Sequence, residues 1–164
     1  ALGPWSDALC RRRGCAVPMG HKRGYHRHYA NATPTPLQRP VLDAERGYVL
    51  APMARGVRLT TGAELGAVDT PQTPVQLQRV EPIARGLVAL GDAVDAQPWM
   101  GARPCLPDML PVIGAAPRHP GLWCAFGHGH QGFTLGPVTG RLLAEMMVGA
   151  PTVVAPEPFR LERF

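Results

Sequence analysis

Glycine and proline interrupt this chain far more often than they interrupt an average protein, and this limits what it can fold into. They number 19 each, so together they make up 38 of the 164 residues, roughly twice their usual share. They follow no three-residue period, which excludes collagen, and they separate short apolar segments. Such frequent interruption also excludes a coiled coil and a long helical bundle. The pattern therefore predicts a small, turn-rich chain that contains both strands and helices.

Basic residues gather near the amino-terminal end. Residues 1–28 hold six of the 17 Lys and Arg residues and one of the 12 acidic residues, a local charge of +5, and the rest of the chain is neutral. A basic end can face anionic lipid or an acidic partner. Nucleic-acid modules interleave aromatic and basic residues, and only Tyr25 and Tyr29 offer this here. We therefore predict no nucleic-acid binding and a solvated or membrane-facing basic surface.

Cysteine and histidine spacing gives no metal site. The four cysteines form no CxxC pair, and no Cys, Asp or Glu nearby in the sequence completes a ligand set around His21, His26 and His28. We interpret these histidines as exposed polar residues, and we predict no metal and reduced cysteines. No apolar run approaches the ~18 residues of a membrane span, and residues 11–13 interrupt the only candidate signal peptide. The prediction is a cytoplasmic protein, with peripheral contact at the inner face of the cytoplasmic membrane as the alternative.

The middle of the chain has the pattern of an antiparallel sheet. Short extended segments at His26–Ala30, Tyr48–Pro52 and Val57–Thr61 are each bounded by turn-forming residues. Residues 71–90 then show helical spacing of apolar residues, with Gly91 as the stop. Pro82 must lie in the first turn of this helix or bend it.

Both ends of the chain contain helical patterns. A first helix is predicted with Ser6 or Asp7 as its cap and Gly14 as its stop. Five prolines within residues 98–117 exclude a regular central strand throughout, leaving a fixed path with a brief extended segment at 110–113. An apolar strand at 121–126 precedes a last helix at 133–148, which ends at Gly149.

A glycine loop joins this last strand and helix. Gly127, Gly129 and Gly132 match G-x-G-x-x-G, but only 15 residues follow Gly149, too few for the second strand of a dinucleotide-binding unit. The loop still directs unpaired backbone N–H groups and a positive helix end at one point. From the residues alone, an electron-rich ligand such as a reduced flavin and a tight turn without ligand are equally good interpretations.

Two long segments carry a resemblance to a known family. Residues 99–114, WMGARPCLPDMLPVIG, resemble the W-x-G-x-R-P-x-x-P-D-x-x-P-x-I-G signature of the D-amino-acid oxidase superfamily, closest to the small subunits of bacterial D-amino-acid dehydrogenases. Residues 122–149 are similar to the last strand, flavin loop and final helix of that family. Residues 3–6, GPWS, resemble its G-x-W-S turn, and residues 158–164 resemble its usual carboxy terminus. The match runs in order through nearly the whole chain.

The resemblance implies an α+β fold that corresponds to the carboxy-terminal part of a two-domain flavoenzyme. Residues 1–15 would end the FAD-domain segment, residues 16–98 would form an antiparallel substrate-binding sheet domain with flanking helices, and residues 99–164 would return with the flavin loop and final helix. The amino-terminal part of the FAD domain has no counterpart in this sequence. The chain is therefore expected to be a fragment or to work with a separate FAD-domain chain.

The resemblance also assigns site residues. Arg103 matches the arginine that holds the substrate carboxylate, a task suited to a planar guanidinium that stays charged. His130 falls where glycine oxidase has a second carboxylate-binding arginine, and Tyr48 aligns loosely with a substrate-site tyrosine, with buried packing as its alternative role. The flavin loop implied by the match consists of Gly127, His128, Gly129, His130, Gly132, Phe133 and Thr134.

The implied function is FAD-dependent oxidative deamination of D-amino acids, with hydride passing from the α-carbon to flavin N5. No side-chain base is required if the substrate amine is neutral, so no residue is nominated as a catalytic acid or base. This chain alone is expected to be inactive, because FAD needs the other half. Oxidation of glycine, sarcosine or cyclic imino acids, and a non-enzymatic binding or assembly module, are the alternatives. Oxygen and a membrane quinone remain open as electron acceptors.

Overall fold

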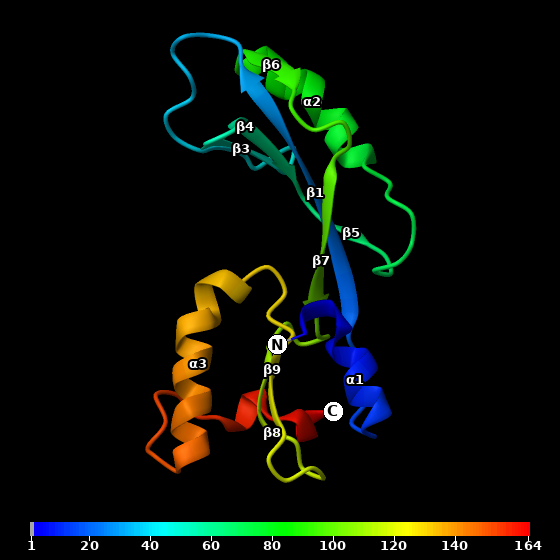
Figure 1. The fold of residues 1–164 in the computed structure, drawn as a ribbon, viewed down its shortest axis with the longest axis vertical. Helices are drawn as coiled ribbons and strands as arrows, with labels where there is room; N and C mark the ends of the chain where they lie inside the picture. The colour runs from blue at the N-terminus through cyan, green and yellow to red at the C-terminus, as the bar shows by residue number, and fades with distance from the viewer. Residues whose placement is uncertain (1) are drawn as a thin grey trace. The chain divides into compact units, whose positions relative to one another are not determined.

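The computed structural model describes residues 2–164 and contains two compact units (Figure 1). Unit 1 comprises the segment up to Lys22 together with Leu65–Val68 and Ala102–Phe164. Unit 2 comprises Arg23–Glu64 and Asp69–Gly101. The three ranges expected from the resemblance, 1–15, 16–98 and 99–164, stay a prediction about the organisation of the whole protein.

An antiparallel sheet dominates unit 2. Its central strand β1 (Gly20–Asn31) lies between β4 and β5 in the order β2-β3-β4-β1-β5, and β6 and β7 also pair with β1. The remaining strands are β2 (Val41–Asp43), β3 (Tyr48–Met53), β4 (Gly56–Thr61), β5 (Glu64–Leu65), β6 (Leu90–Ala93) and β7 (Trp99–Cys105). The three strands expected from the sequence are thus confirmed as parts of β1, β3 and β4.

The two faces of this sheet differ. Helix α2 (Val75–Leu87) packs on one face, where alternate residues of β1 and β4 such as Tyr25, Tyr29 and Leu59 are buried. Side chains alternate between faces along a strand, so their neighbours His26, His28 and Arg58 lie on the opposite face. The buried core of unit 2 consists of Tyr25, Tyr29, Tyr48, Leu50, Val57, Leu59, Leu77, Val80, Ala84 and Leu90.

In unit 2, one glycine has a different role than predicted, and one of the two predicted positions of a proline is excluded. Helix α2 ends at Leu87, and Gly91 is no helix stop but part of β6, where an added Cβ would lie 2.8 Å from the Ala30 carbonyl oxygen. Close approach of two backbones, and not a helix end, therefore requires this glycine. Pro82 lies in the interior of α2, which excludes its placement in the first turn.

Strand β7 was not expected from its prolines. The chain is extended from Trp99 to Cys105, through Pro104, and pairs with β1. Proline lacks an N–H donor but keeps its carbonyl, and here the Pro104 carbonyl accepts a hydrogen bond from Gly129 N at 2.8 Å. A strand is therefore compatible with proline at a position where only the acceptor is used.

Unit 1 contains helices around a two-stranded antiparallel sheet. Strands β8 (Val112–Ala115) and β9 (Trp123–Phe126) pair with each other. The helical elements are η1 (Gly3–Trp5), α1 (Ser6–Arg12), α3 (Gly132–Val148), η2 (Glu157–Phe159) and η3 (Leu161–Arg163). The predicted last strand and last helix are confirmed, and α3 ends as predicted at Gly149, which has a φ of +68°.

Helix α1 begins differently than predicted. Trp5 occupies the N-cap position, and Ser6 and Asp7 lie inside the helix, so neither is its cap. Asp7 instead pairs with Arg11 one turn later, at 2.7 Å. The predicted stop is confirmed, because Gly14 has a φ of +68° and Cys15 N donates to the Cys10 carbonyl at 2.8 Å.

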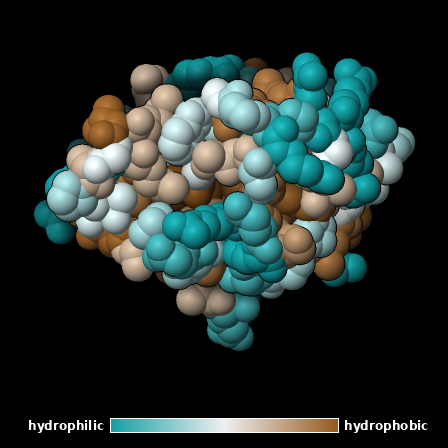
Figure 2. Space-filling view, turned by 90° about the horizontal axis from the view of Figure 1, so that it is seen from below, coloured by the Kyte–Doolittle hydropathy of each residue, from teal (hydrophilic) through white to brown (hydrophobic). Residues whose placement is uncertain are grey.

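The core of unit 1 includes three of the four cysteines. All four thiols are buried and none forms a disulfide, and burial is the main cause that raises the pKa of Cys10. The buried residues of this core are Cys10, Cys15, Val17, Leu106, Val112, Ala116, Cys124, Phe126 and Leu161. Hydrophobic residues also reach the surface between hydrophilic ones, as the view in Figure 2 shows. Within residues 2–164, no helix is both long and apolar enough to span a bilayer.

Candidate functional site

The strand that carries Arg103 is joined directly to the glycine loop. Gly129 N donates to the Pro104 carbonyl at 2.8 Å, and Cys105 forms an antiparallel bridge with His128. The residues next to Arg103 are therefore held by backbone contacts against a loop that follows about 25 residues later. All of these residues belong to unit 1, in which the half-buried Arg103 lies near the end of β7.

Two glycines of the loop adopt left-handed backbone conformations. Gly127 has a φ of +85° and Gly129 a φ of +57°, a region that side chains disfavour. An added Cβ at Gly127 would also lie 2.8 Å from Leu106 Cδ1, and one at Gly129 would lie 3.4 Å from Cys105 Sγ. The loop shape therefore depends on the missing side chains as well as on its hydrogen bonds.

The loop leads into an uncapped helix end. Gln131 is the N-cap of α3 and its side chain caps no backbone N–H group. The first-turn amides of Gly132, Phe133 and Thr134 consequently lack intrahelical acceptors, and they coincide with the positive end of the helix dipole. The Phe133 side chain is 99% exposed. This cradle of amides and glycines fits an electron-rich ring such as the pyrimidine side of a flavin.

The two loop histidines have different surroundings. The ring of His128 is partly buried, its Nε2 lies 2.9 Å from the Thr139 hydroxyl, and burial lowers its pKa. This contact joins the loop to α3. His130 is exposed, and its Nε2 lies 3.1 Å from the Gln131 side-chain nitrogen. Of these two side chains, only that of His130 is turned toward open solvent.

Tyr48 belongs to unit 2 and lies in its core. Its side chain is buried, and burial is the main cause that raises the pKa of its hydroxyl, followed by the neighbouring Asp43. Asp43 is also the direct cross-strand partner of Tyr48 in the pairing of β2 with β3. The Tyr48 ring is therefore packed in the core of unit 2, which is its alternative role. Its contact with substrate stays a prediction.

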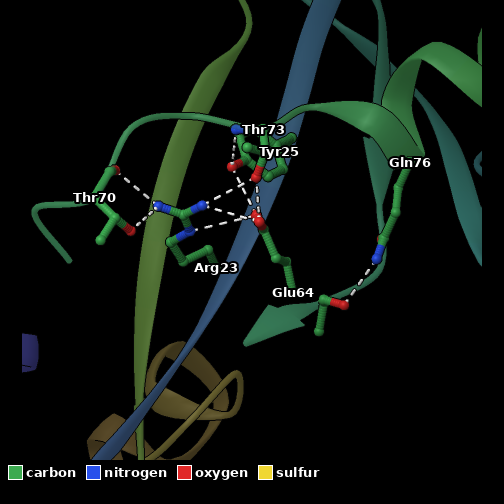
Figure 3. Close-up of polar contacts among 7 residues, drawn as sticks. Arg23, Tyr25, Glu64, Thr70, Thr73 and Gln76 are labelled. Atoms are coloured by element: carbon green, nitrogen blue, oxygen red, sulfur yellow. Dashed lines mark hydrogen bonds and ion pairs between the residues drawn. The ribbon is translucent and has the colours of Figure 1, made fainter. Parts of the chain in front are cut away.

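Unit 2 also contains a polar network that the sequence patterns did not indicate (Figure 3). Arg23 is only 3% exposed, and its Nη2 lies 2.9 Å from Glu64 Oε1. The Tyr25 hydroxyl donates to Glu64 Oε2 at 2.7 Å and accepts from Thr73 N at 2.9 Å. Arg23 Nη1 donates to the Thr70 carbonyl at 2.8 Å, and the Thr73 hydroxyl donates to Glu64.

This network corrects the expected basic surface. Arg23 was counted among the residues of a solvated or membrane-facing end, but it is buried and ion-paired across the chain. The Arg23 guanidinium, followed by Thr73 and Tyr25, lowers the pKa of Glu64 to about 2. No local sequence pattern could predict this ion pair, because Glu64 lies 41 positions after Arg23.

The structure also corrects the interpretation of His28 as an exposed polar residue. Its side chain is buried, and its Nδ1 lies 3.1 Å from Asp95 Oδ2. Asp95 Oδ1 accepts from Arg55 Nη2 at 2.7 Å. His28 is therefore buried and paired.

The strand that carries Arg103, the glycine loop and the uncapped end of α3 are thus joined within unit 1. The family model DAO, FAD dependent oxidoreductase, matches residues 1–146. The chain therefore belongs to this family, whose members depend on FAD, and the α+β fold and the resemblance expected from the sequence are confirmed.

Individual relatives agree with this assignment. The chain is 31% identical over 167 residues to a D-amino acid dehydrogenase of Paramagnetospirillum magneticum, covering 100% of the chain and 39% of the relative. It is 32% identical over 162 residues to a glycine oxidase of Pseudomonas aeruginosa, covering 97% and 43%. The crystal structure of glycine oxidase from Geobacillus kaustophilus superimposes with a TM-score of 0.80 at 28% identity, covering 99% and 44%. The chain thus spans about two fifths of the length of these relatives.

Proposed function

We propose that this chain is the substrate-binding and flavin-loop part of an enzyme that oxidatively deaminates D-amino acids. The observation that carries the proposal is the backbone attachment of the Arg103 strand to the glycine loop, through Gly129 N to the Pro104 carbonyl and the bridge between Cys105 and His128. It links a carboxylate-binding side chain to a helix end suited to an electron-rich ring. The likeness to a D-amino acid dehydrogenase supports the substrate class.

The chain's own residues bind and orient in this proposal. Arg103 pairs with the substrate carboxylate through its two parallel N–H donors, and His130 provides a second, weaker contact. The amides of residues 132–134 and the glycines of the loop hold the flavin ring. Bound FAD would supply the two-electron acceptor for the hydride of the α-carbon, and water would hydrolyse the resulting imino acid to a keto acid and ammonia. Orientation and electrostatics, without a side-chain base, are the contribution of this part of the protein.

Substitution of Arg103 tests the proposal in the complete FAD-loaded protein. Arg103→Met removes the charge-assisted hydrogen bonds to the carboxylate, which contribute about 1.5–3 kcal/mol, so KM should rise roughly 10- to 100-fold. Arg141→Met is the matched control, because Arg141 is an exposed arginine on α3 that pairs with Glu145. Initial rates of flavin reduction over a range of D-alanine concentrations measure the effect. A KM equal to that of the control contradicts the role of Arg103.

Glycine oxidation is a second candidate, supported by the likeness to two glycine oxidases. It predicts turnover of glycine and sarcosine at rates at least equal to those of D-alanine.

The remaining parts of the proposal concern partners: a separate chain that carries the rest of the FAD domain, and a quinone reached by peripheral membrane contact. Copurification of a second chain tests the first partner. Reduction of a quinone in place of oxygen tests the second.

A further inference from the structure

The chain contains a single lysine, and this lysine belongs to the unit that holds the candidate site. Of the 17 Lys and Arg residues, 16 are arginines and Lys22 is the exception. Lys22 is the third residue of β1 and part of unit 1, which also contains Arg103 and the glycine loop. An ammonium differs from a guanidinium in being a compact point charge on a flexible stem. Its surroundings therefore decide what this one lysine can do.

The side chain of Met109 lies between Lys22 and the glycine loop. The Lys22 ammonium donates to Met109 Sδ at 3.8 Å. The terminal methyl carbon of Met109, Cε, lies 3.6 Å from the place that a Cβ of residue 129 would take. One methionine side chain therefore separates the ammonium from Gly129. All three residues belong to unit 1, so this series of contacts stays within one compact unit.

The turn that carries Met109 has an unusual backbone conformation. Met109 has a φ of +60°, and it is the one non-glycine residue with a positive φ among residues 2–164. Met109 N donates to the Leu106 carbonyl at 2.9 Å, and Leu110 N donates to Asp108 Oδ1 at 3.0 Å. Arg163 binds the other Asp108 oxygen at 2.7 Å. Because residues with a side chain disfavour this backbone region, the surrounding contacts must hold the turn in place.

No carboxylate within residues 2–164 forms an ion pair with Lys22. The side chain is half-buried, and the acceptor of its ammonium is the Met109 thioether, which is a weak acceptor. Asp108, the acidic residue of the same turn, is bound by Arg163 instead. The uncapped first turn of α3 adds the positive end of a helix dipole to the loop. A negatively charged group at the loop would therefore be stabilised from both sources.

We propose that Lys22 stabilises the negative charge that the bound flavin gains on reduction and so raises its reduction potential. The inference rests on the contact between the loop and the flavin in the proposed function, and it adds a residue that regulates the same site. A hydride brings two electrons and one proton, so the flavin ring gains one negative charge. The Lys22 ammonium attracts that charge through space, without direct contact and whichever amino acid is oxidised. Lys22 is therefore a positioning residue for charge and not a catalytic acid or base.

The reduction potential of the flavin tests the inference in the complete FAD-loaded protein without any amino acid. Lys22→Met removes the charge, so the equilibrium constant for two-electron reduction should fall about tenfold or more, a shift of about 30 mV or more to negative potential. Lys22→Arg keeps the charge and should retain the potential of the parent protein. Arg12→Met is the matched control, because Arg12 is an exposed arginine on α1. An unchanged potential in Lys22→Met, or an equal shift in Arg12→Met, overturns the inference.

Sulfite binding provides a second readout that needs no turnover. The sulfur lone pair of sulfite forms a bond to flavin N5, nothing leaves, and the ring again gains a negative charge. The Kd of this adduct, measured by the loss of flavin absorbance, should rise about tenfold or more in Lys22→Met and stay unchanged in Lys22→Arg. Lys22→Gln replaces Lys22→Met in both tests if the latter loses its flavin.

The two readouts separate this inference from the proposed function. If D-amino acids do not reduce the flavin but its potential and its sulfite affinity still depend on the charge of residue 22, the proposed substrate class fails and the inference holds. If D-alanine is oxidised and the neutral Lys22 variant keeps the parent potential and sulfite affinity, the inference fails and the proposed function remains.

Discussion

The two units hold their chemically important groups by different means. In unit 1, backbone contacts do so: Gly129 N bonds to the Pro104 carbonyl, and left-handed glycines shape the loop. In unit 2, side chains do so: Glu64 binds Arg23, and Asp95 binds both His28 and Arg55. The first arrangement is sensitive to an added Cβ, whereas the second is sensitive to the loss of a charge or of the apolar core beneath it.

Because of this difference, unit 1 presents backbone groups to a ligand and unit 2 presents side chains. Backbone amides at a helix end favour any electron-rich group and carry little information about its shape. Side chains on a sheet select by charge and form, because their length, hybridisation and protonation differ. The proposed function uses the first property, since the amides of the glycine loop would contact the cofactor.

The largest expected effect comes from the apolar core of unit 2. Leu59→Ala removes a side chain that is 0% exposed, so the free energy of unfolding should fall by about 2–5 kcal/mol. Leu65→Ala is the control, because Leu65 is exposed and its loss should change stability by less than about 0.5 kcal/mol. Urea unfolding of the complete protein measures both, and hydrogen exchange shows whether unit 2 amides open first. Equal stability of the two variants would contradict the assignment of Leu59 to the core.

A smaller effect is expected from the glycine loop. Gly129→Ala forces a side chain into a left-handed conformation, which should destabilise the protein by about 1–2 kcal/mol. Gly86→Ala should have the opposite sign and stabilise by about 0.5–1 kcal/mol, because Gly86 lies in α2 with open space around it. Thermal unfolding of both variants measures these two changes in stability. If both changes stabilise, residue 129 does not need a left-handed backbone.

The smallest effect at neutral pH concerns the charge of Glu64, and it depends on acidity. Because the folded protein lowers the pKa of Glu64 from 4.5 to about 2, its contribution to stability is complete above about pH 4.5 and is lost as the pH falls toward 2. Glu64→Gln should therefore be less stable than the parent protein at pH 6, and the difference should shrink progressively below pH 4.5. Urea midpoints at pH 6, 4 and 3 measure it. A difference that stays constant over this range would show that the carboxylate is not stabilised by Arg23.

Patterns that are local in the sequence predicted most of the fold. Short extended segments bounded by turn-forming residues located β3, β4 and part of β1, and helical spacing located α3 together with its end at Gly149. Proline and glycine were harder to interpret, because one residue type serves several purposes. Gly91 permits close approach of two strands and ends no helix, and Pro104 is accepted within a strand because only its carbonyl is used. The partner segment decides between such uses, and it is distant in the sequence.

The sequence by itself determined the family, the antiparallel character of the sheet and the position of the glycine loop, because each of these is recorded in motifs and periods shorter than about 30 residues. The tertiary structure alone decided which charges are neutralised. Arg23 is buried against Glu64 and His28 is bound to Asp95, whereas the buried Nε of Arg58 has no hydrogen-bond partner among residues 2–164. Charge pairing depends on distances of a few ångströms between residues that here lie 41 and 67 positions apart, and no linear pattern contains those distances.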